Sequence, residues 1–502
     1  MVEASPEWIW VKDGRKAEVR AEIQRSVFIS DHLSSARLQA IADGASLTIW
    51  INGQIVDHVS AHGPLVGFDV TSLLQKGENA ISITAVSVNV APAVALHLTW
   101  TDAKGKNGSL FTNNKWKTNG VIASFGSLAS EPWWDLPPLN VDSIDDYTQW
   151  KRASKAEAGT DPSFFFTLPG YEVELLRSAG KEENSWVSMA FDPKGRITIG
   201  REDRGLLRFT LSSEGQIVRT ESIEDTLKEC RGLLYAHGAL YANANNSRAL
   251  YRLRDLDGDG QFEEKKILYQ SEGGVGHGRN DLALGPDGMI YAIHGDSVHI
   301  PEDLPNRTSP LRRKRLPYRS NEGHVLRMDK EGKKIEVFCG GLRNPYGIAF
   351  NRNGEAFTYD ADAENDMGTP WYRPTRVKHL TSGADFGWRA VTGSWPPYYP
   401  DHPDNTPPTA HIGKGSPTSV KFGYGSGFPP AYRNALFVLD WTFGRILAVH
   451  MIERGAGYAG VPEVFLRGRP LNVTDLAFGP DGAMYFVTGG RRTKSALYRV
   501  SK

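Results

Sequence analysis

The chain has 502 residues, which is more than one ordinary hydrophobic core organises, and this length favours two domains. Its 58 lysine and arginine residues balance 58 aspartate and glutamate residues, which excludes a broad electrostatic attraction to nucleic acid or to a membrane surface. No apolar run is long enough to span a bilayer, and the two cysteines lack the CxxC and CxxCH spacings of zinc ribbons and c-type haem sites.

Residues 1–125 form the first predicted domain, and their pattern is all-β. The run 47–56 has Asn52-Gly53 at its middle and predicts a hairpin with a two-residue turn, because Asn and Gly tolerate positive φ. The stretch 68–83 resembles the galactose-binding-like jelly roll, a β-sandwich found beside many carbohydrate-active catalytic domains. Such domains often bind sugar, and many only pack against their neighbour. We favour the packing role, since a fold alone does not give a function.

Residues 126–165 are interpreted as a linker. Two tryptophans and two prolines between 133 and 138 suggest a segment pinned against a surface, and residues 145–153 predict one short helix. The second predicted domain covers residues 166–502.

This second domain repeats one unit, which is clearest from Gly276 to Asp296. A polar loop leads into a short apolar strand, the turn Gly-Pro-Asp-Gly reverses the chain, and a second apolar strand follows. The copies start near Ser185, Arg231, Asn280, Tyr346, Ser416 and Thr474. Most copies are followed by a further strand, so the repeat predicts a six-bladed β-propeller, with residues 172–176 as the outer strand that closes the ring.

The repeat also predicts where polar side chains gather. Two strands joined by a tight turn have their outer ends side by side, so the loop before the first strand meets the loop after the second. Turn residues such as Gly479-Pro-Asp-Gly482 occupy the opposite end. The face with the loops therefore carries the candidate chemistry, although some of its polar groups are expected to bond one another and seal the central channel.

Three motifs on this face resemble the soluble quinoprotein glucose dehydrogenases and aldose sugar dehydrogenases. They are His277 followed by the strand-turn-strand that ends at Asp296, the run 322–329 after a long insertion, and the Arg343-Asn344 pair in Gly-Leu-Arg-Asn-Pro-Tyr-Gly. The chain looks closer to a related group of secreted bacterial dehydrogenase-like domains, whose activity the resemblance does not fix. One departure is an arginine two positions after the histidine instead of four.

The resemblance implies a catalytic histidine and a quinone cofactor. In such enzymes the histidine takes the proton of a sugar hydroxyl, the Arg-Asn pair contacts pyrroloquinoline quinone, and calcium holds the quinone. Removing that proton needs a neutral imidazole, which Asp296 is expected to orient. The catalytic candidates are therefore His277, Asp296 and Arg343. The quinone is a tricarboxylate, which suits charge-assisted bonds, and the cofactor-binding candidates are Arg343, Asn344, Lys421 and Arg445.

The acidic run Asp360, Asp362 and Glu364 has two functional interpretations. In an extended segment these carboxylates share one side, which suits a hard cation. They equally suit the acid and base of glycoside cleavage, and the alternative without function is a solvated acidic loop. The substrate-binding candidates, which include rings suited to stacking on sugars or to plugging a loop, are Arg279, Asn280, Trp371, Tyr372, Asp440 and Trp441.

A second acidic run resembles the first half of a calcium loop. Asp255, Asp257, Asp259 and Glu263 stand at positions 1, 3, 5 and 9, but position 12 is Lys266, and the flanks are strand-like. We therefore expect a calcium-tied hairpin loop in place of an EF-hand, against the alternative of a simple acidic turn.

The leading interpretation is a quinone-dependent sugar dehydrogenase with calcium, acting on carbohydrate in the periplasm or outside the cell, its signal peptide having been removed. The first alternative is a metal-assisted glycoside hydrolase or polysaccharide lyase on the same face. The second is a propeller that binds glycans without catalysis. The residues name neither the sugar nor the electron acceptor.

Overall fold

The computed structural model describes residues 6–12, 19–43, 45–59, 65–87, 92–118, 121–127, 149–168, 170–308, 322–366, 372–389 and 405–502. The chain divides into two compact units. One comprises Met1–Asp146 with the short stretches Thr167–Gly170 and Val461–Leu466, and the other comprises Tyr147–Phe166, Tyr171–Gly460 and Arg467–Lys502. Among the described residues, no helix has the length and apolar character needed to cross a membrane.

The first unit is a β-sandwich built from two antiparallel sheets. One sheet has the order β2-β7-β4-β5 and the other the order β10-β1-β8-β3-β6, with β9 also paired to β8. The strands are β1 (Glu7–Val11), β2 (Arg20–Ile29), β3 (Leu33–Asp43), β4 (Ala45–Ile51), β5 (Gln54–Val59), β6 (Val66–Asp69), β7 (Gly77–Ser87), β8 (Ala93–Asp102), β9 (Asn107–Phe111) and β10 (Ile122–Ser127).

Alternating burial explains why these strands form a core. In β4, Leu47, Ile49 and Ile51 are buried while the residues between them are partly exposed. The hairpin predicted from Asn52-Gly53 is confirmed: Ile51 pairs with Gln54, and the two turn residues have φ of 50° and 79°. The resemblance to galactose-binding jelly rolls stays a prediction.

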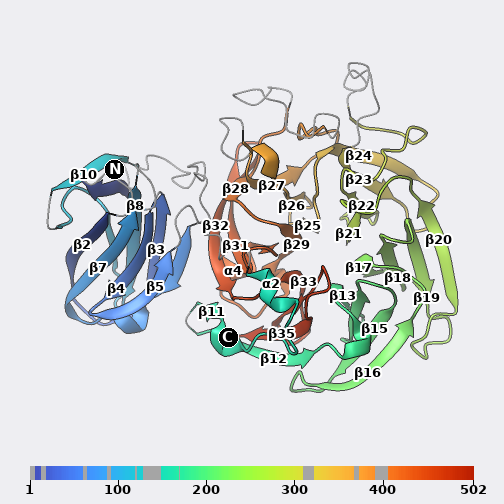
Figure 1. Cartoon of the computed structure of the whole chain (residues 1–502), viewed down its shortest axis with the longest axis horizontal. Helices are drawn as coiled ribbons and strands as arrows, with labels where there is room; N and C mark the ends of the chain where they lie inside the picture. Colours follow the sequence, from blue (N-terminus) through green and yellow to red (C-terminus); the bar gives the residue numbers. More distant parts are fainter. Residues whose placement is uncertain are drawn as a thin grey trace. The chain divides into compact units, whose positions relative to one another are not determined.

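In the described part of the chain, five blades are separate four-stranded antiparallel sheets, and the strands between Pro417 and Arg467 form the sixth blade as part of a larger sheet. The predicted six-bladed propeller is confirmed. The innermost strands surround a central axis (Figure 1). They are β13 (Trp186–Phe191), β17 (Cys230–Ala236), β21 (Arg279–Leu284), β25 (Ile348–Phe350), β29 (Pro417–Phe422) and β33 (Val473–Phe478). The second strands are β14 (Ile197–Arg201), β18 (Ala239–Ala244), β22 (Ile290–His294), β26 (Ala356–Asp360), β30 (Leu436–Asp440) and β34 (Met484–Thr488).

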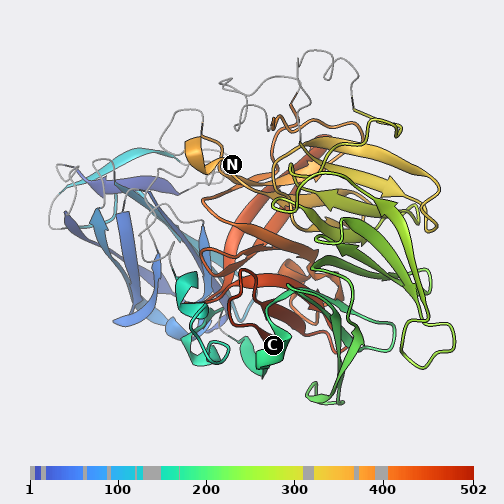
Figure 2. The ribbon, with the colours of Figure 1, turned by 45° about the vertical axis from the view of Figure 1, so that its right-hand side comes forward.

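The outer half of each blade completes the ring. The third strands are β15 (Leu206–Leu211), β19 (Ala249–Arg254), β23 (Gly323–Met328), β27 (Thr375–Leu380), β31 (Arg445–Arg454) and β35 (Ala496–Ser501). The outermost are β16 (Ile217–Glu224), β20 (Glu264–Gln270), β24 (Ile335–Leu342), β28 (Ala410–Gly413), β32 (Gly457–Arg467) and β12 (Glu172–Ser178). Because β12 precedes the first blade and pairs with β35 of the last, it closes the ring as the sequence predicted. Figure 2 shows the blades obliquely as separate twisted sheets.

Apolar side chains between neighbouring blades form the propeller core. Trp186 and Phe209 of the first blade belong to one buried cluster with Tyr485 and Leu497 of the last. A second cluster joins the first and second blades in the same way. Burying such large side chains contributes about 1.5–3 kcal/mol each, so the blades stabilise one another.

Short elements fill the connections. They are α2 (Trp150–Ala153), α4 (Pro430–Arg433), β11 (Phe166–Thr167) and the 3-10 turns η1 (Thr71–Leu73), η2 (Pro162–Phe164), η3 (Lys181–Glu183), η4 (Glu364–Asp366) and η5 (Gly423–Gly425). At the turn end of the propeller, Gly288 donates its N–H to Gly285 and Gly482 donates to Gly479. The repeated Gly-Pro-Asp-Gly turns therefore direct the functional loops to the other end.

Candidate functional site

His277 and Asp296 meet at the loop end of the third blade. His277 stands just before β21, and Asp296 stands two residues after β22, so pairing of these strands brings the two loops together. Nδ1 of His277 lies 2.7 Å from Oδ1 of Asp296. The side chain of His277 is 34% exposed, whereas that of Asp296 is 11% exposed. The pair thus presents an imidazole to solvent over a largely buried carboxylate.

Backbone contacts lock these two loops. Ser297 donates its N–H to the carbonyl of His277, and Ser297 Oγ accepts from the N–H of His277, both at 3.1 Å. Gly295 N–H donates to Gly278 at 2.8 Å. A Cβ at Gly295 would lie 2.7 Å from the carbonyl group of His277, so only glycine allows the approach.

Trp388 joins this pair of residues, and the sequence did not predict it. Its indole N–H donates to Oδ2 of Asp296 at 2.7 Å, and the guanidinium carbon of Arg343 lies 5.3 Å from its ring centre. The backbone N–H of Asp296 donates to the carbonyl of Arg343 at 2.8 Å. His277, Asp296, Trp388 and Arg343 therefore form one connected group across two neighbouring blades. The sole sequence signal for Trp388 was an aromatic residue in a loop after a third strand.

Asp360 binds the backbone of the loop that carries Arg343 and Asn344. It is fully buried, and its carboxylate accepts from the backbone N–H groups of Arg343 and Asn344 at 3.1 and 2.8 Å. Lys378 Nζ lies 2.7 Å away, and burial lowers the pKa of this lysine to about 7. These contacts occupy both carboxylate oxygens, so Asp360 positions the Arg-Asn loop.

The other two acidic candidates have separate partners. Asp362 is buried and accepts from the hydroxyl of Tyr372 at 2.5 Å, and burial raises its pKa to about 7. Glu364 lies in η4 and pairs with Nη2 of Arg343 at 2.6 Å. The expected extended row of carboxylates therefore differs from the structure, in which the chain turns at Glu364. Trp371 lies outside the described residues.

Arg279 and Asn280 face inward. Arg279 is fully buried, and its guanidinium donates to Ser271 Oγ and to the carbonyls of Ser271, Glu272 and Gly274. Asn280 donates to the carbonyl of Pro345 at 2.7 Å. The pairing register of the strand shifts between Arg279 and Leu282, as it does at a β-bulge, and both side chains are buried. They hold the loops in place and are closed to solvent.

The candidates from the fifth blade are also paired internally. Asp440 is fully buried and binds Arg445, and Trp441 donates its indole N–H to the carbonyl of Gly489 at 2.6 Å. Lys421 lies 2.8 Å from Asp281. Burial opposes the charge of Lys421, but the carboxylates of Asp281 and Asp475 outweigh it and raise the lysine pKa. Each of these candidates is therefore bonded to another residue of the propeller.

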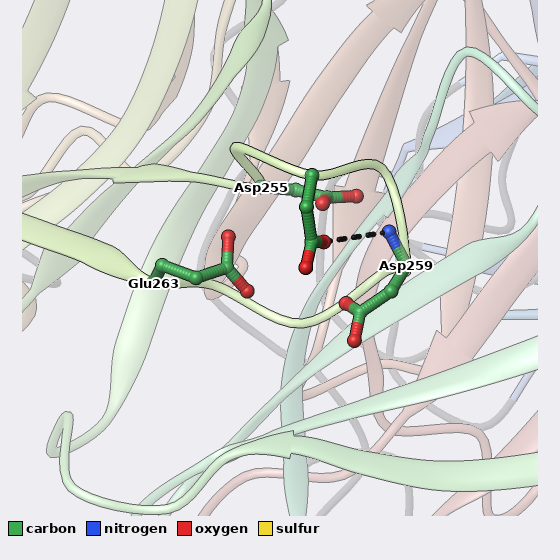
Figure 3. A group of neighbouring side chains, drawn as sticks. Asp255, Asp259 and Glu263 are labelled. Carbon is green, nitrogen blue, oxygen red and sulfur yellow. Dashed lines mark hydrogen bonds between the residues drawn. The ribbon is translucent and has the colours of Figure 1, made fainter.

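The predicted calcium loop connects β19 to β20. One oxygen from each of Asp255, Asp257, Asp259 and Glu263 lies within 4.8 Å of the others. Figure 3 shows Asp255, Asp259 and Glu263 grouped at this loop. Asp255 also accepts from Gly258 and Gly260 at 2.7 and 3.0 Å, which shapes the turn. Four grouped carboxylates are a donor set that fits Ca²⁺.

Comparisons with known proteins agree with the propeller fold. Residues 211–394, less than half of the chain, match a family described as "Domain of unknown function (DUF7133)". No curated protein matches the chain at a significant level.

Solved structures resemble this chain at low identity. The quinone domain of pyranose dehydrogenase from Coprinopsis cinerea is 13% identical over 69% of this chain and 98% of its own, with a TM-score of 0.51. A carbohydrate-active enzyme of family AA12 from Trichoderma reesei is 12% identical over 69% and 99%, with a TM-score of 0.51. A putative glucose dehydrogenase from Thermus thermophilus is 20% identical over 66% and 100%, with a TM-score of 0.49. At these identities, the similarity to the first two structures shows a shared fold and nothing more.

Proposed function

We propose that the propeller oxidises a hydroxyl group of a carbohydrate, with His277 as the base that accepts the hydroxyl proton. The observation that carries this proposal is the 2.7 Å contact between His277 Nδ1 and Asp296. A carboxylate at Nδ1 keeps the proton on that nitrogen and leaves the lone pair on Nε2, which is the arrangement a general base needs. Asp296 also stabilises the imidazolium that forms when His277 takes the proton.

Arg343 and Asn344 are the residues that would hold the cofactor. Arg343 Nε and Asn344 Oδ1 are buried, and neither has a hydrogen-bond partner among the described residues. An unpaired donor and an unpaired acceptor on the Arg-Asn loop fit a ligand that carries carbonyl and carboxylate groups. Pyrroloquinoline quinone, when bound, supplies the acceptor for the hydride from the sugar carbon. Lys421 and Arg445 are weaker candidates because carboxylates already neutralise them.

Further parts of the proposal are a calcium ion in the loop at residues 255–263 and a periplasmic or extracellular location. The fold shared with a quinone-containing pyranose dehydrogenase domain supports the choice of substrate and cofactor class. The grouped carboxylates support calcium.

The test is oxidation of a panel of sugars by protein reconstituted with quinone and calcium, measured as reduction of an artificial electron acceptor. We expect dye reduction that requires the quinone and is lost in His277→Ala, because a general base acts mainly in the transition state. Absence of dye reduction with every sugar, in a protein shown to be folded, would refute the proposal.

The raised pKa of Asp362 favours one alternative. A carboxyl group with a pKa of about 7 is partly protonated near neutrality and suits a general acid for glycoside cleavage. That function predicts new reducing ends from an oligosaccharide without quinone, and loss of this activity in Asp362→Asn. Inactivity in both assays would favour the remaining alternative, a propeller that binds glycans without catalysis.

A further inference from the structure

A cavity opens at the end of the propeller that carries the loops. Its volume is about 680 Å³, within the range of about 300–1,000 Å³ that small-molecule sites occupy. It lies among the loops of the last, first and second blades, which contribute Arg492, Asn184, Glu202 and Glu229. Each of these residues stands before an innermost strand or after a second strand, as His277 and Asp296 do. The cavity and His277 therefore share the loop end of the propeller.

The backbone around this cavity is strained. Asn184, Glu229 and Arg492 have φ of 56°, 53° and 58°, and they are three of the seven non-glycine residues with positive φ in the described chain. Such a conformation costs on the order of 1–3 kcal/mol per residue and is typical of functional sites. Three strained residues from three blades in one cavity indicate that the positions of their side chains matter.

The charges of the cavity point to a neutral ligand. Lysine and arginine side chains come from Lys181, Arg492 and Lys494, and carboxylates come from Glu202, Asp203 and Glu229. Equal numbers of both signs give no preference for an ion. A sugar hydroxyl both donates and accepts, so adjacent hydroxyls satisfy a carboxylate and a guanidinium together. No aromatic side chain is found in the described lining, which points to hydrogen bonding over stacking.

The cavity adjoins the His277 loop through Glu229. Arg231 donates to Glu229 at 2.8 Å and to the carbonyl of Gly276, next to His277, at 3.0 Å. Asn245, the neighbour of the lining residue Asn246, donates to the carbonyl of Val275 and accepts from the N–H of Arg279. Glu229 of the cavity wall therefore binds both Arg231 and Asn245, the residues that support the His277 loop.

We propose that this cavity is a second carbohydrate subsite, which binds a neutral sugar unit of an oligosaccharide whose hydroxyl is oxidised at His277. This inference rests on the proposed function for the reaction, but the cavity's affinity for sugar can be measured without any reaction. It specifies the substrate class as an oligosaccharide in place of a monosaccharide.

The test is calorimetric titration of the whole protein, without quinone, with neutral and uronate-containing oligosaccharides chosen from a glycan array. Arg492→Ala and Asp203→Ala each remove one charged hydrogen-bonding group and should weaken binding of a neutral oligosaccharide by about tenfold or more. Arg204→Ala is the matched control, because Arg204 is exposed in the same loop and does not line the cavity. It should leave binding unchanged.

The outcomes separate this inference from the proposed reaction. Neutral oligosaccharide binding that is weakened in both cavity variants supports the subsite, even if no sugar is oxidised. Equal binding by the cavity variants and the control, a preference for uronates, or no binding at all would overturn it, even if monosaccharides are oxidised at His277.

Discussion

The indole N–H of Trp388 lies 2.7 Å from Oδ2 of Asp296, while Oδ1 of the same carboxylate holds His277 at 2.7 Å. Each oxygen of Asp296 therefore has its own partner, and the carboxylate cannot rotate without losing one of them. Since Trp388 comes from the fourth blade and Asp296 from the third, the orientation of His277 depends on contact between two blades.

Trp388→Phe tests this orienting role. The substitution removes the N–H and keeps a ring beside Arg343. Loss of one hydrogen bond of about 1–1.5 kcal/mol should lower kcat about tenfold with little change in KM. Trp116→Phe, which removes an indole bond to Phe111 in the sandwich, is the control and should leave kcat unchanged.

Lys378→Met tests whether Asp360 is structural. The lysine is 1% exposed and neutralises a carboxylate that is fully buried. Removing one partner of a buried pair costs about 3–5 kcal/mol because the other charge is left uncompensated. Denaturant unfolding should show a loss near the lower end of this range, since backbone N–H groups still bind Asp360. The exposed Lys228→Met should change stability by about 0.5 kcal/mol or less. Equal stability of the two variants would contradict the assignment.

Much of the fold could be predicted because local chemistry encodes it. The Gly-Pro-Asp-Gly turns at 285–288 and 479–482, and the alternating strands around them, specify a blade without reference to the rest of the chain. The meeting of His277 with Asp296 follows from the same hairpin geometry.

The rest of the site depends on contacts that no local pattern contains. Trp388 reaches Asp296 across 92 positions, so its role depends on how two blades pack. Arg279 was expected on the face with the loops, yet it lies inside the protein next to a shift in strand register, and burial lowers its pKa to about 10. A bulge adds one residue to a strand, so the side chains that follow it lie on the opposite face of the sheet. The simple alternation of buried and exposed residues does not predict such a change.

Asp362→Asn should change how stability depends on pH. Burial raises the pKa of Asp362 from 3.8 to about 7, so the folded protein keeps a proton that the unfolded chain releases. The stability this proton contributes is complete below about pH 4 and is lost as pH rises to 7. Asparagine mimics the protonated form without titrating. The variant should therefore match the wild type near pH 4 and exceed it by a few kcal/mol at pH 8, because each pKa unit corresponds to about 1.4 kcal/mol.

Denaturant titrations at the two pH values measure this difference. An advantage of Asp362→Asn that is the same at pH 4 and pH 8 would show that Asp362 does not carry a raised pKa.

Calcium removal should destabilise the loop between β19 and β20. A ligand that binds only the folded state at 100 times its Kd adds about 2.7 kcal/mol, so EDTA should lower the Tm by several degrees. Asp255→Asn combined with Asp257→Asn removes two of the four carboxylates and should abolish the effect of EDTA. A wild-type Tm that calcium and EDTA leave unchanged would show that the loop is only an acidic turn.

The most direct test of the account is a single-turnover measurement of bound pyrroloquinoline quinone. The protein is loaded with quinone, mixed rapidly with an oxidisable sugar, and followed by the absorbance of the cofactor. The wild type should reduce its bound quinone, and His277→Ala should bind quinone equally well but reduce it about 10²- to 10⁴-fold more slowly, as expected for the loss of a general base. Quinone that does not bind the wild type, or that is reduced at the same rate in both proteins, would contradict the account.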